Sequence, residues 1–257
     1  MIKRIVFMAA MLATTAIMMV GQAPSPDEQK GIQAIQEAAP KGVDAMAAAV
    51  DDFAAKFPNS PLKPAVLSAT GDAYESTGNA ARAMIYYQSA LDADPKHYYS
   101  MLMLASEIAR GTKEFEIDEA AKTAKLNKAE KYAKDGLALL ATAPKPNPAA
   151  TDEQWNTLKK DDEARAHEAL GMIAMLRKKN DVAISEFKQA VQVGVSPQPT
   201  AMIRLAGAYT DSAKFTEAMA ELDKVIAIPG LPAAYKQVAE NEKKRAAQLK
   251  AQADGKK

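Results

Sequence analysis

The chain has no cysteine among its 257 residues. Without thiols it can form neither a disulfide nor a thiolate metal site, so packing alone must hold the fold together. The missing thiol also excludes a bacterial lipid anchor, which is attached through cysteine. Composition therefore predicts a protein whose stability comes from its core.

Histidine is almost as scarce, since His97 and His167 are the only two. A site built from several histidines is impossible. The run that starts at His167 begins like a zinc-protease helix, but Gly171 stands where the second metal ligand is required. We therefore predict no metal site, and we expect His167 to pack inside its helix pair.

The motifs of common enzyme classes are missing as well. The sequence has no G-x-S-x-G, no phosphate-binding loop and no dinucleotide fingerprint. Asp51 with Asp52 and Asp161 with Asp162 are pairs adjacent in sequence, which we expect to be solvent-exposed or to cap helices rather than to act as catalytic partners. The sequence predicts no catalytic residues, no enzyme activity and no cofactor.

Charge of one sign does not dominate. The chain carries 33 Lys and Arg against 32 Asp and Glu, for a net charge of +1. A phosphate-binding stripe would need a clustered basic excess, so nucleic acid is not an expected partner.

The first 23 residues differ from the rest. Lys3 and Arg4 precede an uncharged apolar stretch over residues 5–20, and a small-x-small ending closes at Ala23. This pattern predicts a secretory signal. Pro24 directly after the cut would hinder cleavage, so an uncleaved N-terminal anchor is the alternative. The body is expected in the periplasm or secreted, or else in the periplasm on an inner-membrane anchor; only this segment would contact a membrane.

Small residues recur at a fixed spacing in the body of the chain. They fall in pairs 12 positions apart: Gly71 and Ala83, Gly171 and Ala183, Ala206 and Ala218. Both members of the second pair reappear 35 residues later in the third (171 to 206, 183 to 218). A fixed period in this range indicates stacked supersecondary units, which present extended binding surfaces.

These residues resemble the tetratricopeptide repeat over about residues 64–230. The residues that match its packing positions are Gly71, Tyr74, Ala83, Tyr87, Ala90 and Pro95; Gly171, Ala183, Phe187 and Ala190; and Ala206, Tyr209 and Ala218. The resemblance implies an all-α, right-handed helix-turn-helix solenoid. Glycine inside a helix costs about 1 kcal/mol relative to alanine. We expect Gly71 to be needed because the paired helix approaches closely at Ala83.

The same reading divides the chain into segments. After the signal or anchor (1–23) we expect an irregular helical pair (24–62), about four repeat units (63–230), a capping helix (231–250) and a frayed tail (251–257). The second unit carries an insertion near 112–127 that should extend its second helix from an N-cap at Asp118. A proline-rich linker (142–151) ends in a capping-box start at Thr151. Trp155 then either packs over neighbouring helix ends or serves a partner.

In the resembled family the first helices line a concave face. The residues that this implies for partner binding here are Tyr99, Leu102, Met103, Ser106, Arg165, Met172, Met175 and Ile203. They suggest an apolar groove beside an acidic first unit with Asp72 and Glu75, and burial against neighbouring units is the alternative. Ser68, Asp72 and Met103 stand where relatives that clamp a terminal carboxylate have basic or amide residues, so that mode is not expected.

The sequence therefore predicts an exported scaffold that binds a protein or peptide partner in the bacterial envelope. A second reading is architectural, with binding through the edges at the Phe115 insertion and the Trp155 segment. A small-molecule carrier or an enzyme is the less favoured third reading.

Overall fold

The structure is a computed structural model that describes residues 24–145, 150–195 and 197–255. Within these ranges every regular element is helical and no strand occurs. The protein is all-α, as the sequence predicted. The proposed signal or anchor over residues 1–23 lies outside the described residues. In the described part, no helix combines the length and the apolar character that crossing a bilayer requires.

The chain begins with a short helical pair. It comprises α2 (Pro26–Ala38), the 3-10 turn η2 (Ala39–Lys41) and α3 (Val43–Lys56). Ser25 opens α2 with a capping box, because its side chain accepts from the Glu28 N–H while the Glu28 carboxylate accepts from the Ser25 N–H. Phe53 is buried between this pair and the next helix, so the pair joins the core of the array.

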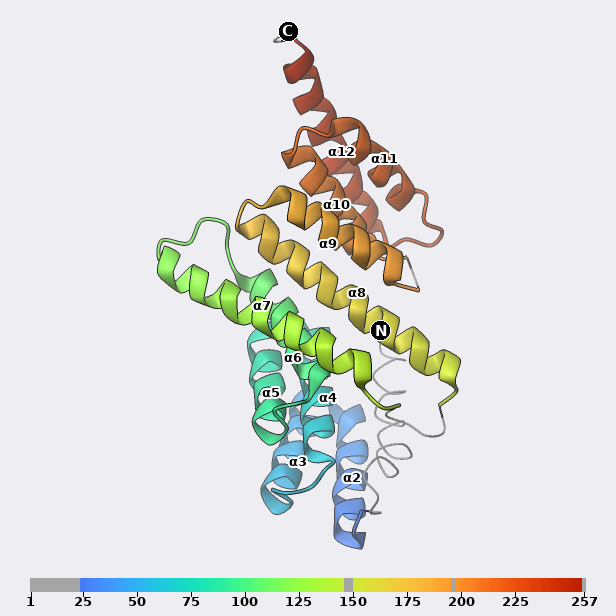
Figure 1. Ribbon diagram of the computed structural model, residues 1–257. Helices are drawn as coiled ribbons and strands as arrows, with labels where there is room; N and C mark the ends of the chain where they lie inside the picture. The colour runs from blue at the N-terminus through green and yellow to red at the C-terminus, as the bar shows by residue number, and fades with distance from the viewer. Residues whose placement is uncertain (1–23, 146–149, 196, 256–257) are drawn as a thin grey trace.

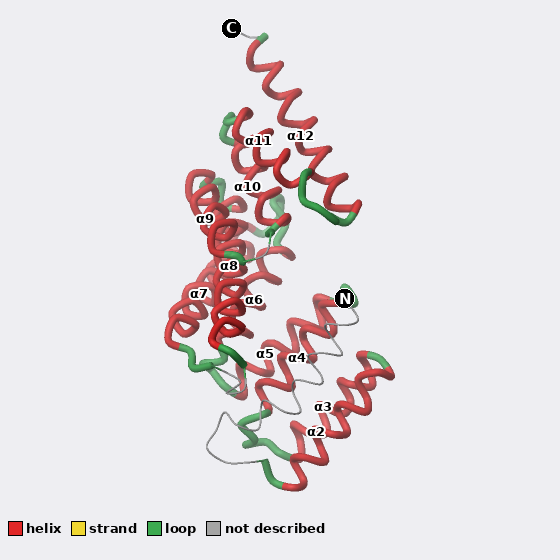
Figure 2. The backbone as a smooth tube through the Cα atoms, turned by 90° about the vertical axis from the view of Figure 1, so that its right-hand side faces the viewer, coloured by secondary structure: helices red, strands yellow, loops and turns green. Residues whose placement is uncertain are grey.

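Four helix pairs and a final helix follow. They are α4 (Lys63–Ser76) with α5 (Ala80–Ala93), α6 (Tyr98–Gly111) with α7 (Glu119–Thr142), α8 (Asp152–Leu176) with α9 (Asn180–Val193), and α10 (Pro199–Asp211) with α11 (Phe215–Ile226), then α12 (Ala233–Asp254). Each first helix packs along its own second helix, and successive pairs stack into one column (Figure 1). Viewed from the side, the column bends between α5 and α6 (Figure 2). This is the predicted helix-turn-helix solenoid.

The recurring spacing of glycine and aromatic ring has a direct steric cause. A Cβ added at Gly71 would lie 2.5 Å from Cε1 of Tyr87, and one added at Gly171 would lie 2.5 Å from Cε1 of Phe187. Real atoms cannot approach so closely, so glycine leaves room for the ring of the paired helix. We expected the close contact at Ala83; the structure places it one turn later, at the ring of Tyr87.

The other predicted packing residues lie mostly in the core. The buried ones are Tyr74, Ala83, Ala90, Ala183, Ala190, Ala206 and Ala218. Tyr209 is partly buried and packs against two clusters. Pro95 is exposed, which corrects its assignment as a packing residue. It follows Asp94, the C-cap of α5, where proline cannot continue a helix.

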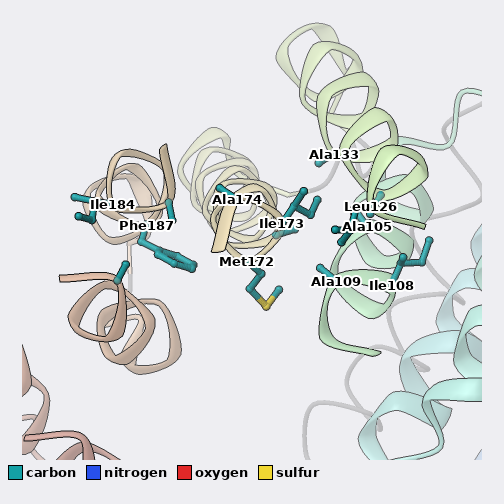
Figure 3. Close-up of a cluster of buried hydrophobic side chains, with 14 of the residues drawn as sticks. Ala105, Ile108, Ala109, Leu126, Ala133, Met172, Ile173, Ala174, Ile184 and Phe187 are labelled. Atoms are coloured by element: carbon teal, nitrogen blue, oxygen red, sulfur yellow. The ribbon is translucent and has the colours of Figure 1, made fainter. Parts of the chain in front are cut away.

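The central core joins three units. Ala105 of α6, Leu126 of α7, Ile173 of α8 and Phe187 of α9 belong to one cluster of buried side chains (Figure 3). Small residues there let the helices approach, and the larger side chains fill the space between them. The cluster fixes the relative positions of α6, α8 and α10, which carry the candidate site.

Two helices extend beyond the repeat length. The Asp118 side chain accepts the Ala121 N–H at 2.9 Å, so α7 starts at Glu119 as predicted. Thr151 forms the predicted capping box with Gln154, and α8 then runs for 25 residues. Trp155 is buried in a cluster with Leu102. Of the two roles expected for this residue, the structure supports packing against neighbouring helices. The centre of the proline-rich linker, residues 146–149, lies outside the described residues.

The last helix differs from its predicted form in two ways. The spacing of Tyr235, Val238, Ala239 and Ala246 predicts one apolar face for this helix. Ala239 and Ala246 are buried, but Tyr235 and Val238 are 37% and 51% exposed. Only small residues of α12 are buried against α10 and α11, because the helices pack closely there. The helix also continues to Asp254, so residues 251–254 are helical instead of frayed.

Candidate functional site

The surface formed by α4, α6, α8 and α10, here called the first-helix face, carries the predicted partner-binding residues. Four of these residues are buried: Leu102 and Met103 are 0% and 1% exposed, and Ser106 and Met172 are buried too. Leu102 packs against Trp155, and Met103 lies in the cluster around Tyr87. The reason is the position of α6, which packs between α5, α7 and α8. Leu102, Met103 and Ser106 cannot form an exposed groove, which corrects that part of the prediction.

The methionines of α8 have a different environment. Met172 and Met175 line an open pocket of about 830 Å³ between α6, α8, α10 and α12. Met172 projects from α8 into the space between Ala109 and Phe187 (Figure 3). Leu176 and Ala109 complete the apolar floor. Ile203 is not part of the pocket; it packs, partly buried, against the cluster around α11 and α12.

Charged side chains surround this floor, and we call the whole cavity the arginine pocket. Its charged lining comprises Arg110, Lys178, Arg204, Arg245, Glu114 and Asp211. Each cation has a carboxylate neighbour: Arg110 pairs with Glu75 at 2.5 Å and with Glu107, Lys178 with Glu114, Arg204 with Glu168, and Arg245 with Asp211 at 2.6 Å. The pocket therefore combines an apolar floor with ordered ionic walls.

Burial has the largest effect on the ionisation of Arg204. Burial, and then the charge of Arg110, lower the pKa of Arg204 to about 10, even though Glu168 contacts its guanidinium. Exclusion of water destabilises the charged form of a guanidinium, and a second cation nearby adds to this effect. Sequence reasoning missed Arg110, which comes from the last turn of α6.

A second polar group lies on the same face, where α4 approaches α6 and α8. Oδ1 of Asp72 accepts the hydroxyl of Tyr87 at 2.7 Å and that of Tyr99 at 2.9 Å. Burial raises the pKa of Asp72 to about 6, against the effect of these two hydrogen bonds. Tyr99, one of the predicted binding residues, thus bridges α6 to α4 through this carboxylate.

Asp162 of α8 joins this group. Burial raises the pKa of Asp162 to about 7, although the charge of Arg165 lowers it. We had expected Asp162 to be exposed or to cap a helix, and that is wrong. Its neighbour Asp161 accepts a hydrogen bond from the N–H of Val195, in the loop after α9, at 3.2 Å. Asp162 lies in the N-terminal extension of α8, before the first position of the repeat unit. It stands three residues before Arg165, so both lie on one helix face, and this spacing could have identified Asp162 from the sequence.

We call this second group the acidic cluster. Its charged members are Asp72, Glu75, Glu107, Arg110, Asp162 and Arg165. Four carboxylates accompany two guanidinium groups, so the cluster carries two excess negative charges when all are ionised. Oδ2 of Asp72 and Nε of Arg165 are buried and have no hydrogen-bond partner. Such groups are rare in folded proteins and require an explanation.

The histidines and acidic residues form no metal centre in the described part of the chain. Among residues 24–145, 150–195 and 197–255, no group of three or more His, Asp or Glu side chains could hold a metal ion. His97 hydrogen-bonds Ser100 at 2.9 Å, and His167 hydrogen-bonds Glu186 of α9 at 2.7 Å. The second contact places His167 inside its helix pair, as we expected from the repeat register.

Comparison with known proteins agrees with this architecture. Residues 39–98 match the family model of the tetratricopeptide repeat, which covers η2, α3, α4 and α5. The match begins within the segment that we had separated from the array as an irregular pair. No curated protein matches the chain.

Two solved structures resemble the whole fold. TTC0263, a thermophilic TPR protein of Thermus thermophilus, is 18% identical with a TM-score of 0.56, over 84% of this chain and 98% of its own. PilF of Pseudomonas aeruginosa is 13% identical with a TM-score of 0.52, over 88% of this chain and 86% of its own. At these identities the likeness concerns the fold alone. The chain has the fold of tetratricopeptide-repeat proteins, which generally mediate protein–protein interactions, and residues 39–98 match the repeat itself.

Proposed function

We propose that this protein is a scaffold, exported to the bacterial envelope, that binds a segment of a partner protein on its first-helix face. The arginine pocket is the observation that carries the proposal. It is the place on this face where the partly exposed Met175 borders an open pocket, with the buried Met172 at its floor. No catalytic step and no cofactor are part of the proposed role.

The chemistry of the pocket suits a peptide segment. Methionine side chains are flexible and adapt to varied apolar partners. Arginine side chains such as Arg204 and Arg245 provide several N–H donors each, and arginine is enriched where binding energy concentrates. A pocket of about 830 Å³ accommodates a few residues, not a folded domain. The partner would therefore present an exposed loop or tail.

Export is proposed on the sequence alone. Lys3 and Arg4, the apolar stretch and the ending at Ala23 support a secretory signal, and Pro24 supports an uncleaved anchor. Expressing the full chain in a bacterium and sequencing the N-terminus of the protein released from the periplasm distinguishes these outcomes. A mature chain starting at Pro24 supports cleavage, and a membrane-bound full chain supports the anchor. Retention of the full chain in the cytosol would refute export.

The binding site is tested by photo-crosslinking. A photoreactive amino acid replaces Met175 in the pocket, and as a matched control it replaces Ile85, which is 63% exposed on α5. We expect a discrete crosslinked partner from the first position and none from the second, in cells that express the protein at its natural level. Equal crosslinking at both positions would show that the pocket is not the binding site.

One observation favours a second candidate, an architectural role through the edge of the array. Phe115 and Ile117 are 84% and 106% exposed on the loop between α6 and α7. Deleting the whole insertion would remove Lys122, which is buried in α7, so point changes are the better test. Replacing Phe115 and Ile117 with serine should abolish binding by an edge contact and leave crosslinking at Met175 unchanged.

A further inference from the structure

We infer that the partner segment places a carboxylate in the arginine pocket, from an aspartate or glutamate side chain that stands next to an apolar residue. This inference rests on the proposed function and names the chemistry that the partner must carry. The pocket is open and has a volume of about 830 Å³, so it has room for an acidic side chain together with an apolar neighbour.

The first argument is the charge of the cavity wall. Among the described residues that line the pocket, four are cations and two are carboxylates: Arg110, Lys178, Arg204 and Arg245 against Glu114 and Asp211. The other carboxylates that pair with these arginines do not line the cavity; they are Glu75, Glu107, Glu168 and Glu242. A group inside the pocket therefore meets more positive than negative charge at the wall, which favours an anion.

The second argument is that the arginines have unused donors. Arg110 donates to Glu75 and to Glu107 through the same nitrogen, Nη2. Arg204 donates to Glu168 through Nη1, and within the described part of the chain its Nε and Nη2 have no acceptor. Neither of these two atoms is among the buried atoms that lack a partner, so both are accessible from outside. An accessible pair of N–H groups on one guanidinium can bind a carboxylate through two parallel hydrogen bonds.

The lowered pKa of Arg204 agrees with this assignment. Burial, and then the charge of Arg110, lower this pKa to about 10. A carboxylate in the pocket would offset the charge of Arg110 and would supply the acceptor that Nε and Nη2 lack. A cationic side chain or a metal ion would instead add to the repulsion between the two arginines, so neither fits the pocket.

The apolar floor determines what must stand next to the carboxylate. Ala109, Met172, Met175 and Leu176 form this floor, directly beside the arginines. A small free anion would satisfy Arg204 but would leave the floor in contact with water. A peptide in which an apolar residue flanks the acidic one covers the floor as well, which adds the free energy of apolar burial.

The test is NMR of the purified protein with isotope-labelled methionine methyl groups, because the side chain of Met175 borders the pocket and reports binding there. The probes are acetylated, amidated tripeptides that carry glutamate, glutamine or lysine between two leucines. We expect the glutamate peptide to shift the Met175 signal and to bind at least about fivefold more tightly than the other two. Equal or tighter binding of the glutamine or lysine peptide, or no binding of the glutamate peptide, would overturn the inference.

A fourth peptide separates the two sources of a carboxylate. It carries glutamine between the leucines and ends in a free carboxylate instead of an amide. We expect it to bind more weakly than the glutamate peptide. Binding that is as tight or tighter would assign the site to the end of a chain and would overturn the assignment to a side chain.

Variants locate the site. Arg204→Gln combined with Glu168→Gln removes a cation together with its partner carboxylate, so no charge of this pair is left unpaired. The double variant should bind the glutamate peptide at least about fivefold more weakly. Lys131→Gln removes an exposed cation of α7 and is the matched control, which should change nothing. Unchanged binding by the double variant would overturn the inference.

Glu168→Gln alone separates a binding role of Arg204 from a structural one. It releases Nη1 of Arg204, so the glutamate peptide should bind at least about twofold more tightly. If Arg204 served the ion pair alone, the variant would lower the urea midpoint without any gain in binding, and that result would overturn the inference. A protein that crosslinks its partner at Met175 but shows no preference for the glutamate peptide would keep the proposed function and exclude the carboxylate.

Discussion

The hydroxyl of Tyr87 donates to the carboxylate of Asp72 at 2.7 Å, while the ring of Tyr87 covers Gly71, the residue before it. One side chain therefore fills the space between the paired helices and also donates a hydrogen bond to a carboxylate of the acidic cluster. Tyr87 is fully buried, so its hydroxyl meets Asp72 inside the packed helices. Packing of α5 against α4 thus positions a charged group of the candidate site.

Gly71→Ala should destabilise the protein by about 1–3 kcal/mol, because the new methyl group would overlap the Tyr87 ring. Urea unfolding followed by circular dichroism measures the change. Gly111→Ala in α6 is the matched control, since a Cβ there meets nothing within 4 Å. That variant should be neutral or more stable by up to about 1 kcal/mol. Equal effects of the two changes would contradict the steric explanation.

Tyr87→Phe should raise the pKa of Asp72 above about 6, because the hydroxyl of Tyr87 stabilises the charged carboxylate. The ring, and with it the packing on Gly71, is retained. Titration of the carboxyl carbon by NMR follows Asp72 directly. Tyr86→Phe removes a hydroxyl that contacts Asp51 instead, so it should leave Asp72 unchanged. A pKa of Asp72 that stays the same in Tyr87→Phe would show that Tyr99 alone supports the carboxylate.

Met103→Ala should cost about 2–5 kcal/mol, because its side chain is fully buried and a cavity would remain. Met175→Ala should cost less, since this side chain borders an open pocket. Thermal unfolding of the two variants compares the sites. Similar losses would indicate that Met175 is buried in solution and that the pocket is closed.

The repeat spacing predicted the helix pairs because Gly71 and Gly171 each make room for one ring, and this requirement is local. The starts of α7 and α8 were equally readable, since Asp118 and Thr151 cap their own helices. Each of these features depends on residues within one helix or one helix pair. Sequence reasoning therefore identified the architecture and most helix boundaries.

The candidate site was only partly predictable, because it depends on contacts between units. The register placed Leu102 and Met103 on the first-helix face, but the packing of α6 between its neighbours buries that face. Asp162 was missed because the extension of α8 lies outside the repeat register. On α12 the predicted face was too wide, since close packing admits only Ala239 and Ala246. Helix faces can be read from sequence, whereas the angle between units cannot.

The stability of the protein should pass through a maximum in the mildly acidic range. The raised pKa values of Asp72 (about 6) and Asp162 (about 7) mean that the folded state holds protons that the unfolded state has released. Stability therefore falls as the pH rises from about 4 through 7. Glu130 acts oppositely: hydrogen bonds from Lys134 and Arg177 lower its pKa to about 2. Its contribution is lost as the pH falls from about 4.5 towards 2.

Urea midpoints measured from pH 3 to pH 8 test this dependence of stability on pH. One variant identifies the group behind the decline at higher pH, and a second variant identifies the group behind the decline at low pH. Asp162→Asn should flatten the decline above about pH 4, because no proton is then released from the buried site. Glu130→Gln should flatten the acid side and lower stability near neutral pH, since Arg177 loses its charged partner. A wild-type protein that is more stable at pH 8 than at pH 5.5 would mean that Arg165 compensates both carboxylates fully.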